Sequence, residues 1–493
     1  AHYNAAIEAS FATAGADGAE EAIAQFPYNQ SNYKQSIGVS KWVALAGVNT
    51  FEGWCEARRL DYPAFGSVTG SQMYNENDDS SYKPELYVPG TFYTPIKVDD
   101  KVIAGVGFPQ DSMVRRMKGP AGTKVNITVK RGHDEVPFEI TRGKIPLHSV
   151  DAHFMVNDTT GYIRLSKFSA TTYPEFMEAA LDLRKNGMKS IILDLRDNSG
   201  GFLEQAASIA NEFLYKGEKI VYIEGLHRKR RDINADGNGS MQKYGIIVLI
   251  NESSASASEI LAGAIQDNDR GVIIGRRSFG KGLVQEPVDF SDGSGLRLTV
   301  ARYYTTSGRC IQKPYSDYDH DIYNRYTGGE VFSADSAKLN KDDLHVTLGG
   351  RKVYGGGGIM PDVFVPIDTT RASSFFVSCN KKATQMRYAS SVFDKYYKSL
   401  SEIDDYKVLD QFLKRVDIPS GFRKFASSKD GIVCSDDEYY RTLQYLEPQL
   451  NALVARYSKL GDNAFYKYYL PVDETVKIAM ETSPNPVFEN GGK

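Results

Sequence analysis

The sequence predicts an α/β domain over residues 145–366 in which helices pack in layers against a central sheet. Patterns typical of strands alternate there with patterns typical of helices. The strand pattern at 189–196 is a continuous apolar run, as expected for a strand that is covered on both faces. The residues on either side carry mainly helical patterns, so we expect helical N- and C-terminal extensions around the layered domain.

The elements of this domain are expected to alternate along the chain. A helix over 171–187 is predicted to begin with a capping box of Thr172 and Glu175 and to end at Gly187. Residues 226–240 are charged and contain glycine, so we expect a loop. The other expected elements are strands 161–168, 189–196, 219–225, 244–251 and 271–275, helices 203–214 and 256–267, and a hairpin over 283–305.

Residues 96–144 differ from this pattern and predict a small α+β module. The expected elements are a strand at 96–107, a helix at 111–119, and strands 123–131 and 136–142 joined by a turn.

The two ends of the chain are predicted to be separate units. In residues 1–95, apolar side chains recur at helical spacing from Trp42 to Phe51. Residues 367–493 contain helical patterns at 401–416 and 439–460, and their last eleven residues, 483–493, are typical of disorder.

The composition excludes several classes of function. The chain has 493 residues, 41% of them hydrophobic, and a formal net charge of −3, which disfavours a nucleic-acid partner. It contains no apolar run long enough to span a membrane, and no signal sequence is visible at its start. The four cysteines and seven histidines lack the spacing of metal ligands, so we expect no metal and no cofactor.

Ser256 is the first candidate for chemistry. A buried strand is predicted to end at Asn251, and a helix follows after several small residues. A serine at a helix start lies beside unpaired N–H groups, which stabilise a developing negative charge. The N–H of Ala257 would then donate to an oxyanion. The alternative, equally favoured by this segment alone, is that one of these serines only caps the helix.

Lys281 is the second candidate, between two glycines that follow a strand. A lysine acts as a general base only when it is neutral, which requires burial to offset a reference pKa of about 10.4. Gln285 is placed to orient its amine. The alternative is a solvated loop lysine. A phosphate-binding loop is excluded because position 282 is glycine and a strand pattern follows.

Gly200 and Gly201 form the third candidate segment, in a polar turn after the strand at 189–196. One of them would bring a backbone N–H close to a substrate, as the second donor of an oxyanion hole. The alternative is an ordinary strand-to-helix turn. No histidine lies in any of the three segments, and the G-x-S-x-G motif is absent, so the histidines are expected to be structural.

The segments LDLRDNSGG, SASASEI and SFGKGLVQ, taken in order, resemble the carboxyl-terminal processing (tail-specific) peptidases of family S41. The resemblance covers about residues 96–365 and includes the closing segment 353–366. It implies a ClpP/crotonase-like fold and a serine endopeptidase without a metal. Ser256 would be the nucleophile, Lys281 the general base and Gln285 the residue that orients it. Ala257 with Gly200 or Gly201 would form the oxyanion hole.

The same resemblance implies that a PDZ domain precedes the catalytic domain. Residues 96–142 look like its second half, and the half that would carry the carboxylate-binding loop is not recognisable. A partial PDZ-like module over 96–144 is therefore expected.

Residues 1–95 resemble instead the C-terminal part of the SusD/RagB family, glycan-binding lipoproteins of the Bacteroidetes outer membrane. A chimeric sequence joined near residues 93–98 is our hypothesis, and a divergent N-terminal domain is the alternative. A reading frame that continues through the native locus would contradict misassembly.

Three functions follow from these resemblances. The first is a serine endopeptidase that cleaves proteins at or near their C-terminal regions, in the periplasm or at the outer membrane. The second is a glycan-binding protein, and the third is an inactive S41 homologue that binds peptides. The expected partner is a protein or peptide substrate, and the sequence does not specify an oligomeric state.

Overall fold

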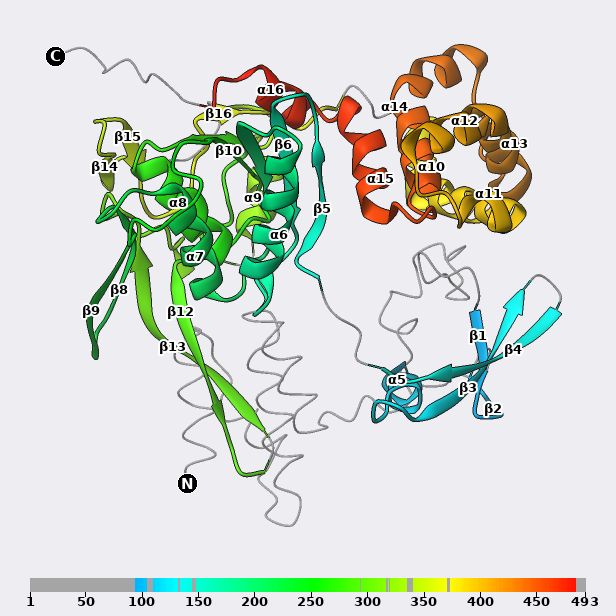
Figure 1. The fold of residues 1–493 in the computed structure, drawn as a ribbon, viewed down its shortest axis with the longest axis horizontal. Coiled ribbons are helices and arrows are strands. Elements are labelled where there is room, and N and C mark those ends of the chain that lie inside the picture. The colour runs from blue at the N-terminus through cyan, green and yellow to red at the C-terminus, as the bar shows by residue number, and fades with distance from the viewer. Residues whose placement is uncertain are drawn as a thin grey trace, which may run out of the picture. The chain divides into compact units, whose positions relative to one another are not determined.

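The computed structural model describes most of the chain after residue 93: residues 94–103, 110–131, 134–143, 148–292, 294–315, 318, 320–334, 340–369 and 373–484. The chain divides into two compact units, 1–143 and 144–493 (Figure 1). The predictions for residues 1–93 and for 485–493 lie outside the described residues.

The described part of the first unit is a four-stranded antiparallel sheet with one helix, α5 (Gln110–Met117). Its strand order is β2 (Lys101–Val102), β1 (Thr94–Val98), β3 (Lys124–Arg131) and β4 (Asp134–Thr141). The predicted strand 96–107 is wrong over its described part, 96–103, because Asp99 and Asp100 take positive φ angles of 46° and 64° and turn the chain between β1 and β2. Its remainder, 104–107, lies outside the described residues.

A six-stranded sheet forms the centre of the second unit. Its order is β16 (Val363–Phe364), β11 (Val272–Gly275), β10 (Gly245–Ile250), β7 (Ser190–Asp194), β6 (Thr160–Leu165) and β5 (Val150–Met155). All neighbouring strands are parallel except β5 and β6. Every residue of β10 is buried, as its apolar sequence requires in the middle of a covered sheet.

Helices cover both faces of this sheet, and Figure 1 shows the layers. One face packs against α6 (Thr172–Lys185), α7 (Leu203–Phe213) and α8 (Ala257–Asp267) through the main buried cluster of the unit. The opposite face packs against α16 (Glu474–Glu481) and the short 3-10 helix before it, η5 (Leu470–Val472). The predicted α/β class and its layered packing are confirmed.

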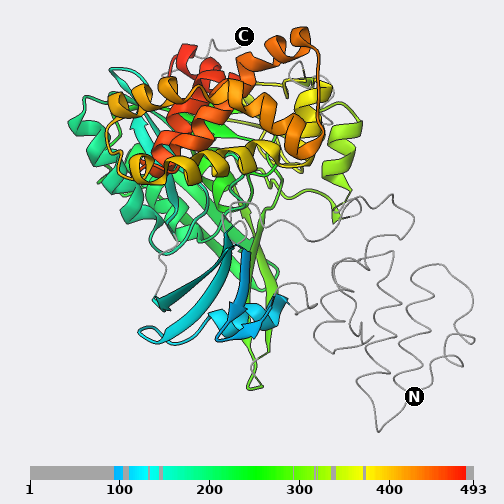
Figure 2. The same ribbon diagram turned by 90° about the vertical axis from the view of Figure 1, so that its right-hand side faces the viewer.

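A second, antiparallel sheet has the order β12 (Leu283–Asp289), β13 (Gly295–Tyr304), β8 (Lys219–Gly225) and β9 (Arg228–Asn234). The β12–β13 hairpin extends away from the rest of the unit in both views (Figures 1 and 2). The predicted loop 226–240 is wrong over β9. This edge strand carries RKRRDIN and is almost wholly exposed, so it shows no apolar alternation, and its charges are those that protect sheet edges.

The chain after residue 373 is helical, as predicted. Helices α12 (Tyr406–Val416) and α14 (Asp436–Ala455) fall within or overlap the predicted segments. The others are α10 (Ser374–Lys381), α11 (Thr384–Leu400), α13 (Ile418–Asp430) and α15 (Gly461–Tyr469), and α10–α15 share a separate core. Figure 1 shows these helices gathered on one side of the second unit. Asn463 of α15 accepts the His153 N–H of β5 at 2.7 Å, which joins this bundle to the sheet edge.

The N-cap of α6 is Thr171, not Thr172, and the predicted capping box does not form. The Glu175 carboxylate turns instead to the N–H groups of Ser149 and Val150, at 2.6 and 3.1 Å. Of the helices that the structure describes, none is both long and apolar enough to cross a membrane.

Candidate active site

The three segments selected from the sequence leave adjacent strands at the same edge of the large sheet. We name them the glycine turn (195–202, after β7), the serine turn (251–256, after β10) and the lysine turn (276–282, after β11). The three strands are parallel neighbours. The carboxyl ends of neighbouring parallel strands form the usual ligand-binding edge of α/β proteins. The topology therefore brings the three turns together.

Ser256 lies at the N-cap position of α8. Its φ and ψ are 55° and −113°, a conformation that residues with a side chain rarely adopt. Such backbone strain concentrates at functional sites. The first-turn N–H groups of α8 point towards this end, and the helix dipole adds partial positive charge. Ser256 therefore occupies a position suited to a nucleophile whose reaction develops an oxyanion.

Glu259 links the serine turn to the lysine turn. Its Oε2 accepts the Ser256 N–H at 2.8 Å and the Lys281 N–H at 2.9 Å. Its Oε1 accepts the Gly280 N–H at 2.7 Å and the Ser278 hydroxyl at 2.5 Å. The side chain is fully buried, and burial raises its pKa although these four donors favour the ionised form. One carboxylate thus holds the main chains of both candidate residues.

Tyr303 of β13 makes a second link on the carbonyl side. Its hydroxyl donates to the Ser256 carbonyl at 3.1 Å and also contacts the Lys281 carbonyl. Burial raises the pKa of Tyr303 well above its ordinary value, so the phenol keeps the proton that it donates. Ser256 and Lys281 are therefore held through their N–H groups by Glu259 and through their carbonyls by Tyr303.

The sequence interpretation did not select Glu259 or Tyr303. Glu259 had a signal, because Ser256-x-x-Glu259 has the spacing of a capping box. Tyr303 had no such signal in the sequence, because it lies 47 residues from Ser256 and its strand has no unusual pattern.

Gly200 packs directly against the serine turn. A Cβ atom on it would lie 2.6 Å from the Ala255 carbonyl oxygen and 2.8 Å from the Ser256 Cβ, and its φ is +97°. Its N–H donates to Asn198 Oδ1 at 2.9 Å. Gly201, with φ +146°, closes onto the Phe168 carbonyl, where no Cβ fits. Only glycine satisfies these two positions.

Lys281 and Gln285 are close together in the sequence but have different surroundings. The Lys281 side chain is partly buried, and both of its main-chain groups are bonded as described. Gln285 is exposed in β12 and donates to Thr299 Oγ1 of β13 at 3.4 Å. Its predicted role in orienting the lysine stays a prediction.

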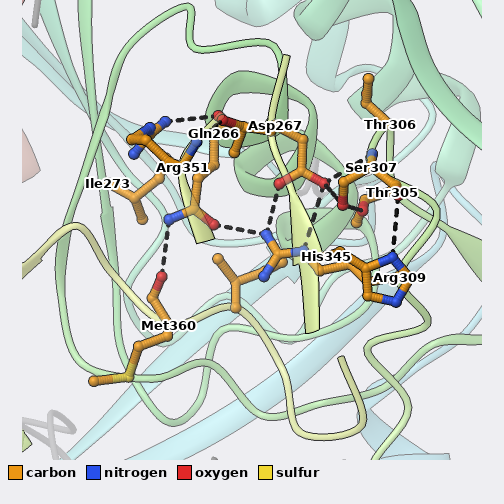
Figure 3. Close-up of polar contacts among 12 residues, drawn as sticks. Gln266, Asp267, Ile273, Thr305, Thr306, Ser307, Arg309, His345, Arg351 and Met360 are labelled. Carbon is orange, nitrogen blue, oxygen red and sulfur yellow. Dashed lines mark hydrogen bonds and ion pairs between the residues drawn. The ribbon is translucent and has the colours of Figure 1, made fainter. Parts of the chain in front are cut away.

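The far end of α8 is anchored by a buried ion pair (Figure 3). Arg309 Nη2 donates to Asp267 Oδ1 at 2.7 Å, and both side chains have no exposed surface. Ser307 donates to the other Asp267 oxygen at 2.7 Å. The helix that carries Ser256 is therefore fixed at both ends.

Two of the described histidines lie beside aspartate side chains. His345 Nε2 lies 2.7 Å from Asp343 Oδ1, and its Nδ1 lies 3.1 Å from the carbonyl oxygen of Ser307, beside Asp267 (Figure 3). His153 lies 3.5 Å from Asp182. Among the described residues, no group of three or more His, Cys, Asp or Glu side chains has the arrangement of a metal site.

The sequence comparisons identify the family that the three turns resemble. Residues 159–322 match the family model of peptidase family S41. The resemblance of this segment to family S41, predicted from the sequence, is therefore confirmed. The match includes all three turns and both Ser256 and Lys281.

Several curated proteins are similar to this chain. A probable CtpA-like serine protease of Staphylococcus haemolyticus is 38% identical over 216 residues, 44% of this chain and 43% of that protein. A carboxyl-terminal-processing protease of Synechocystis sp. is 40% identical over 208 residues, 41% and 48% of the two chains. A carboxy-terminal-processing protease of Bartonella bacilliformis is 38% identical over 270 residues, 52% and 61%. The chain thus spans about half the length of the curated relatives it matches.

A solved structure is also similar to this chain, at a lower sequence identity. The photosystem II D1 C-terminal processing protease is 27% identical, with a TM-score of 0.33, and the match covers 56% of this chain and 63% of that one.

A different family matches the start of the chain. Residues 1–85 match a SusD-like family described as starch-binding and associating with the outer membrane. Two families therefore match separate segments, which agrees with the two resemblances found in the sequence.

Proposed function

We propose that the chain is a serine endopeptidase in which Ser256 is the nucleophile and Lys281 the general base. The observation that carries the proposal is the shared bonding of the two residues to one oxygen of Glu259. A carboxylate that accepts both N–H groups keeps a nucleophile and a base on adjacent turns at a fixed separation. Positioning of this kind contributes a large part of an enzyme's rate enhancement.

The reaction begins with proton transfer from the Ser256 hydroxyl to the neutral Lys281 amine. The Ser256 Oγ bonds to the scissile carbonyl carbon, and the carbonyl oxygen becomes an oxyanion. The N–H of Ala257, at the start of α8, is one donor to this oxyanion. Because Asn198 already accepts the Gly200 N–H, Gly201 is the better second donor.

The intermediate then collapses. The C–N bond breaks as Lys281 returns the proton to the leaving amine, which leaves an acyl group on Ser256. Lys281 next takes a proton from water, the hydroxide attacks the acyl carbon, and the proton returns to Ser256 Oγ. Gln285 would orient the Lys281 amine after rotating away from Thr299.

Substrates are protein or peptide chains cleaved at or near their C-terminal regions. This part of the proposal rests on the similarity to carboxyl-terminal-processing proteases and on the PDZ-like interpretation of residues 96–144. The site of action is the cell envelope, which is supported by the outer-membrane description of the family matched by residues 1–85.

Hydrolysis of casein and of peptides with a free or amidated C-terminus tests the proposal. Wild type is expected to cleave, with preference for the free C-terminus, and Ser256→Ala and Lys281→Met are expected to be inactive. Equal cleavage by wild type and Ser256→Ala would remove Ser256 from the mechanism. Binding of substrate peptide without cleavage by any variant would favour an inactive peptide-binding homologue.

A second function is favoured by the match over residues 1–85 alone. We propose that this segment binds starch or a related glycan. Retardation of the full chain in a native gel that contains starch, compared with a gel without it, tests this function. Migration that is unchanged by starch would exclude it.

A further inference from the structure

Helix α16, near the C-terminal end of the described chain, contacts the glycine turn through one ion pair. Asp473 is the N-cap of α16 and accepts the Thr475 and Val476 N–H groups at 3.0 and 3.3 Å. The same carboxylate receives Arg196 Nη1, at 3.0 Å to Oδ1 and 2.8 Å to Oδ2. The two side chains are 14% and 12% exposed, so solvent and salt screen this pair little.

The other side of the Arg196 guanidinium is fixed to the end of β7. Its Nε donates to Asp194 Oδ1 at 2.9 Å, and its Nη2 donates to Oδ2 at 2.6 Å. Asp194 has no exposed surface and also accepts the Tyr162 hydroxyl at 2.7 Å. Arg196 is therefore clamped between a carboxylate of the sheet and a carboxylate of α16.

Asn198, two residues after Arg196 in the glycine turn, connects this turn to the serine turn by hydrogen bonds. The Asn198 carbonyl accepts the Ala255 N–H at 3.0 Å and the Ser258 hydroxyl at 2.8 Å. Its side-chain oxygen accepts the Gly200 N–H. A displacement of Arg196 would therefore move both the glycines and the turn that carries Ser256.

We propose that Asp473 is a positioning residue for the oxyanion-binding glycine turn, which makes α16 part of the catalytic machinery. The apolar side of α16 packs on the sheet through Val476 and Ala479, so the N-terminus of this helix is a fixed support. The ion pair then ties Arg196 to that support. This inference rests on the proposed peptidase function, and its test separates the two.

The variant Asp473→Asn isolates the ion pair. Asparagine caps a helix as well as aspartate does, so α16 keeps its cap while the charge on Arg196 is lost. The matched control is Asp405→Asn in α12. Asp405 is also an N-cap and accepts the Lys407 and Val408 N–H groups at 2.8 and 3.1 Å, but it is exposed and caps a helix of the separate bundle.

Two measurements are made on the full chain. Peptide hydrolysis is expected to show a fall in kcat of about tenfold for Asp473→Asn with KM unchanged, since a misplaced catalytic group costs up to about 10²-fold. Hydrogen exchange is expected to be faster in residues 195–202 of this variant. Asp405→Asn is expected to match wild type in both measurements.

The outcomes decide between the proposals. An unchanged kcat for Asp473→Asn, unchanged exchange at 195–202, or equal losses in Asp405→Asn would overturn the positioning role. If the wild type shows no cleavage that depends on Ser256, the peptidase proposal fails, and the exchange comparison alone decides whether Asp473 holds the turn.

Discussion

Ser256 and Lys281, 25 residues apart in the sequence, donate their main-chain N–H groups to the same atom, Oε2 of Glu259, at 2.8 and 2.9 Å. The relative position of the two residues therefore depends on one buried carboxylate. No contact between the two reactive side chains is needed to hold the turns in place.

Replacing Glu259 by glutamine is expected to lower kcat by about 10²-fold or more. Glutamine keeps the shape of the side chain but presents an NH2 donor to N–H groups that need an acceptor, so the two turns separate. Peptide hydrolysis by purified Glu259→Gln measures this loss.

The control for this substitution is Glu212→Gln in α7. Glu212 is also buried and accepts the Ser240 N–H and hydroxyl, at 2.7 and 2.8 Å, but it lies outside the three turns. Its variant is expected to lose stability and to keep kcat. A Glu259→Gln enzyme with the kcat of Glu212→Gln would contradict the role of Glu259.

Replacing Gly200 by alanine is expected to abolish measurable hydrolysis. The new Cβ would lie 2.6 Å from the Ala255 carbonyl oxygen and 2.8 Å from the Ser256 Cβ, which forces the glycine and serine turns apart. The matched control is Gly217→Ala, where φ is +87° and no atom lies within 4 Å of the new Cβ. Both variants are expected to lose about 1–2 kcal/mol to backbone strain. Similar activities for the two would show that close packing at Gly200 is unimportant.

The sequence predicted those parts of the fold and site that depend on local pattern. The apolar runs of β7 and β10 located the sheet, and the small residues after Asn251 located the start of α8. Since each candidate segment follows a strand, parallel pairing was enough to bring Gly200, Ser256 and Lys281 to one edge.

Features that depend on distant pairing could not be predicted. β9 has no apolar residue pattern, and only its pairing with β8 makes it a strand. Tyr303 contacts Ser256, which lies 47 residues away in the sequence. Asp473 contacts Arg196, which lies 277 residues away. No local pattern carries such contacts. Glu259 is the exception, because its spacing from Ser256 was visible in the sequence.

Replacing Asp267 by asparagine is expected to lower the free energy of unfolding by about 3–5 kcal/mol, because it leaves the buried Arg309 charge without its counterion. Asp232→Asn removes an aspartate from surface ion pairs with Arg230 and Lys219 and is expected to change stability little. Urea unfolding of the two variants measures the difference. Equal midpoints would contradict the anchoring role of the Asp267–Arg309 pair (Figure 3).

Two buried carboxylates of this unit are expected to affect stability with opposite dependence on pH. Burial alone would raise the pKa of Asp194, but the charges of Arg196 and Arg164 outweigh it and lower the pKa well below its ordinary 3.8. The unfolded state therefore binds the proton more readily than the folded state. The stabilisation by Asp194 is present above pH 3.8 and is lost as the pH falls below it.

Burial raises the pKa of Glu259 above 4.5, although its hydrogen-bond donors favour the ionised form. The folded state then binds the proton more readily, so its contribution to stability falls as the pH rises from 4.5 to the raised value. Urea unfolding between pH 3 and 8, in about one-unit steps, compares wild type with Asp194→Asn and Glu259→Gln. The loss of unfolding free energy in Asp194→Asn, relative to wild type, is expected to shrink as the pH falls below 3.8. The corresponding loss in Glu259→Gln is expected to shrink as the pH rises above 4.5. Losses that change in the same direction for both variants would show that the arginines do not set the charge of Asp194.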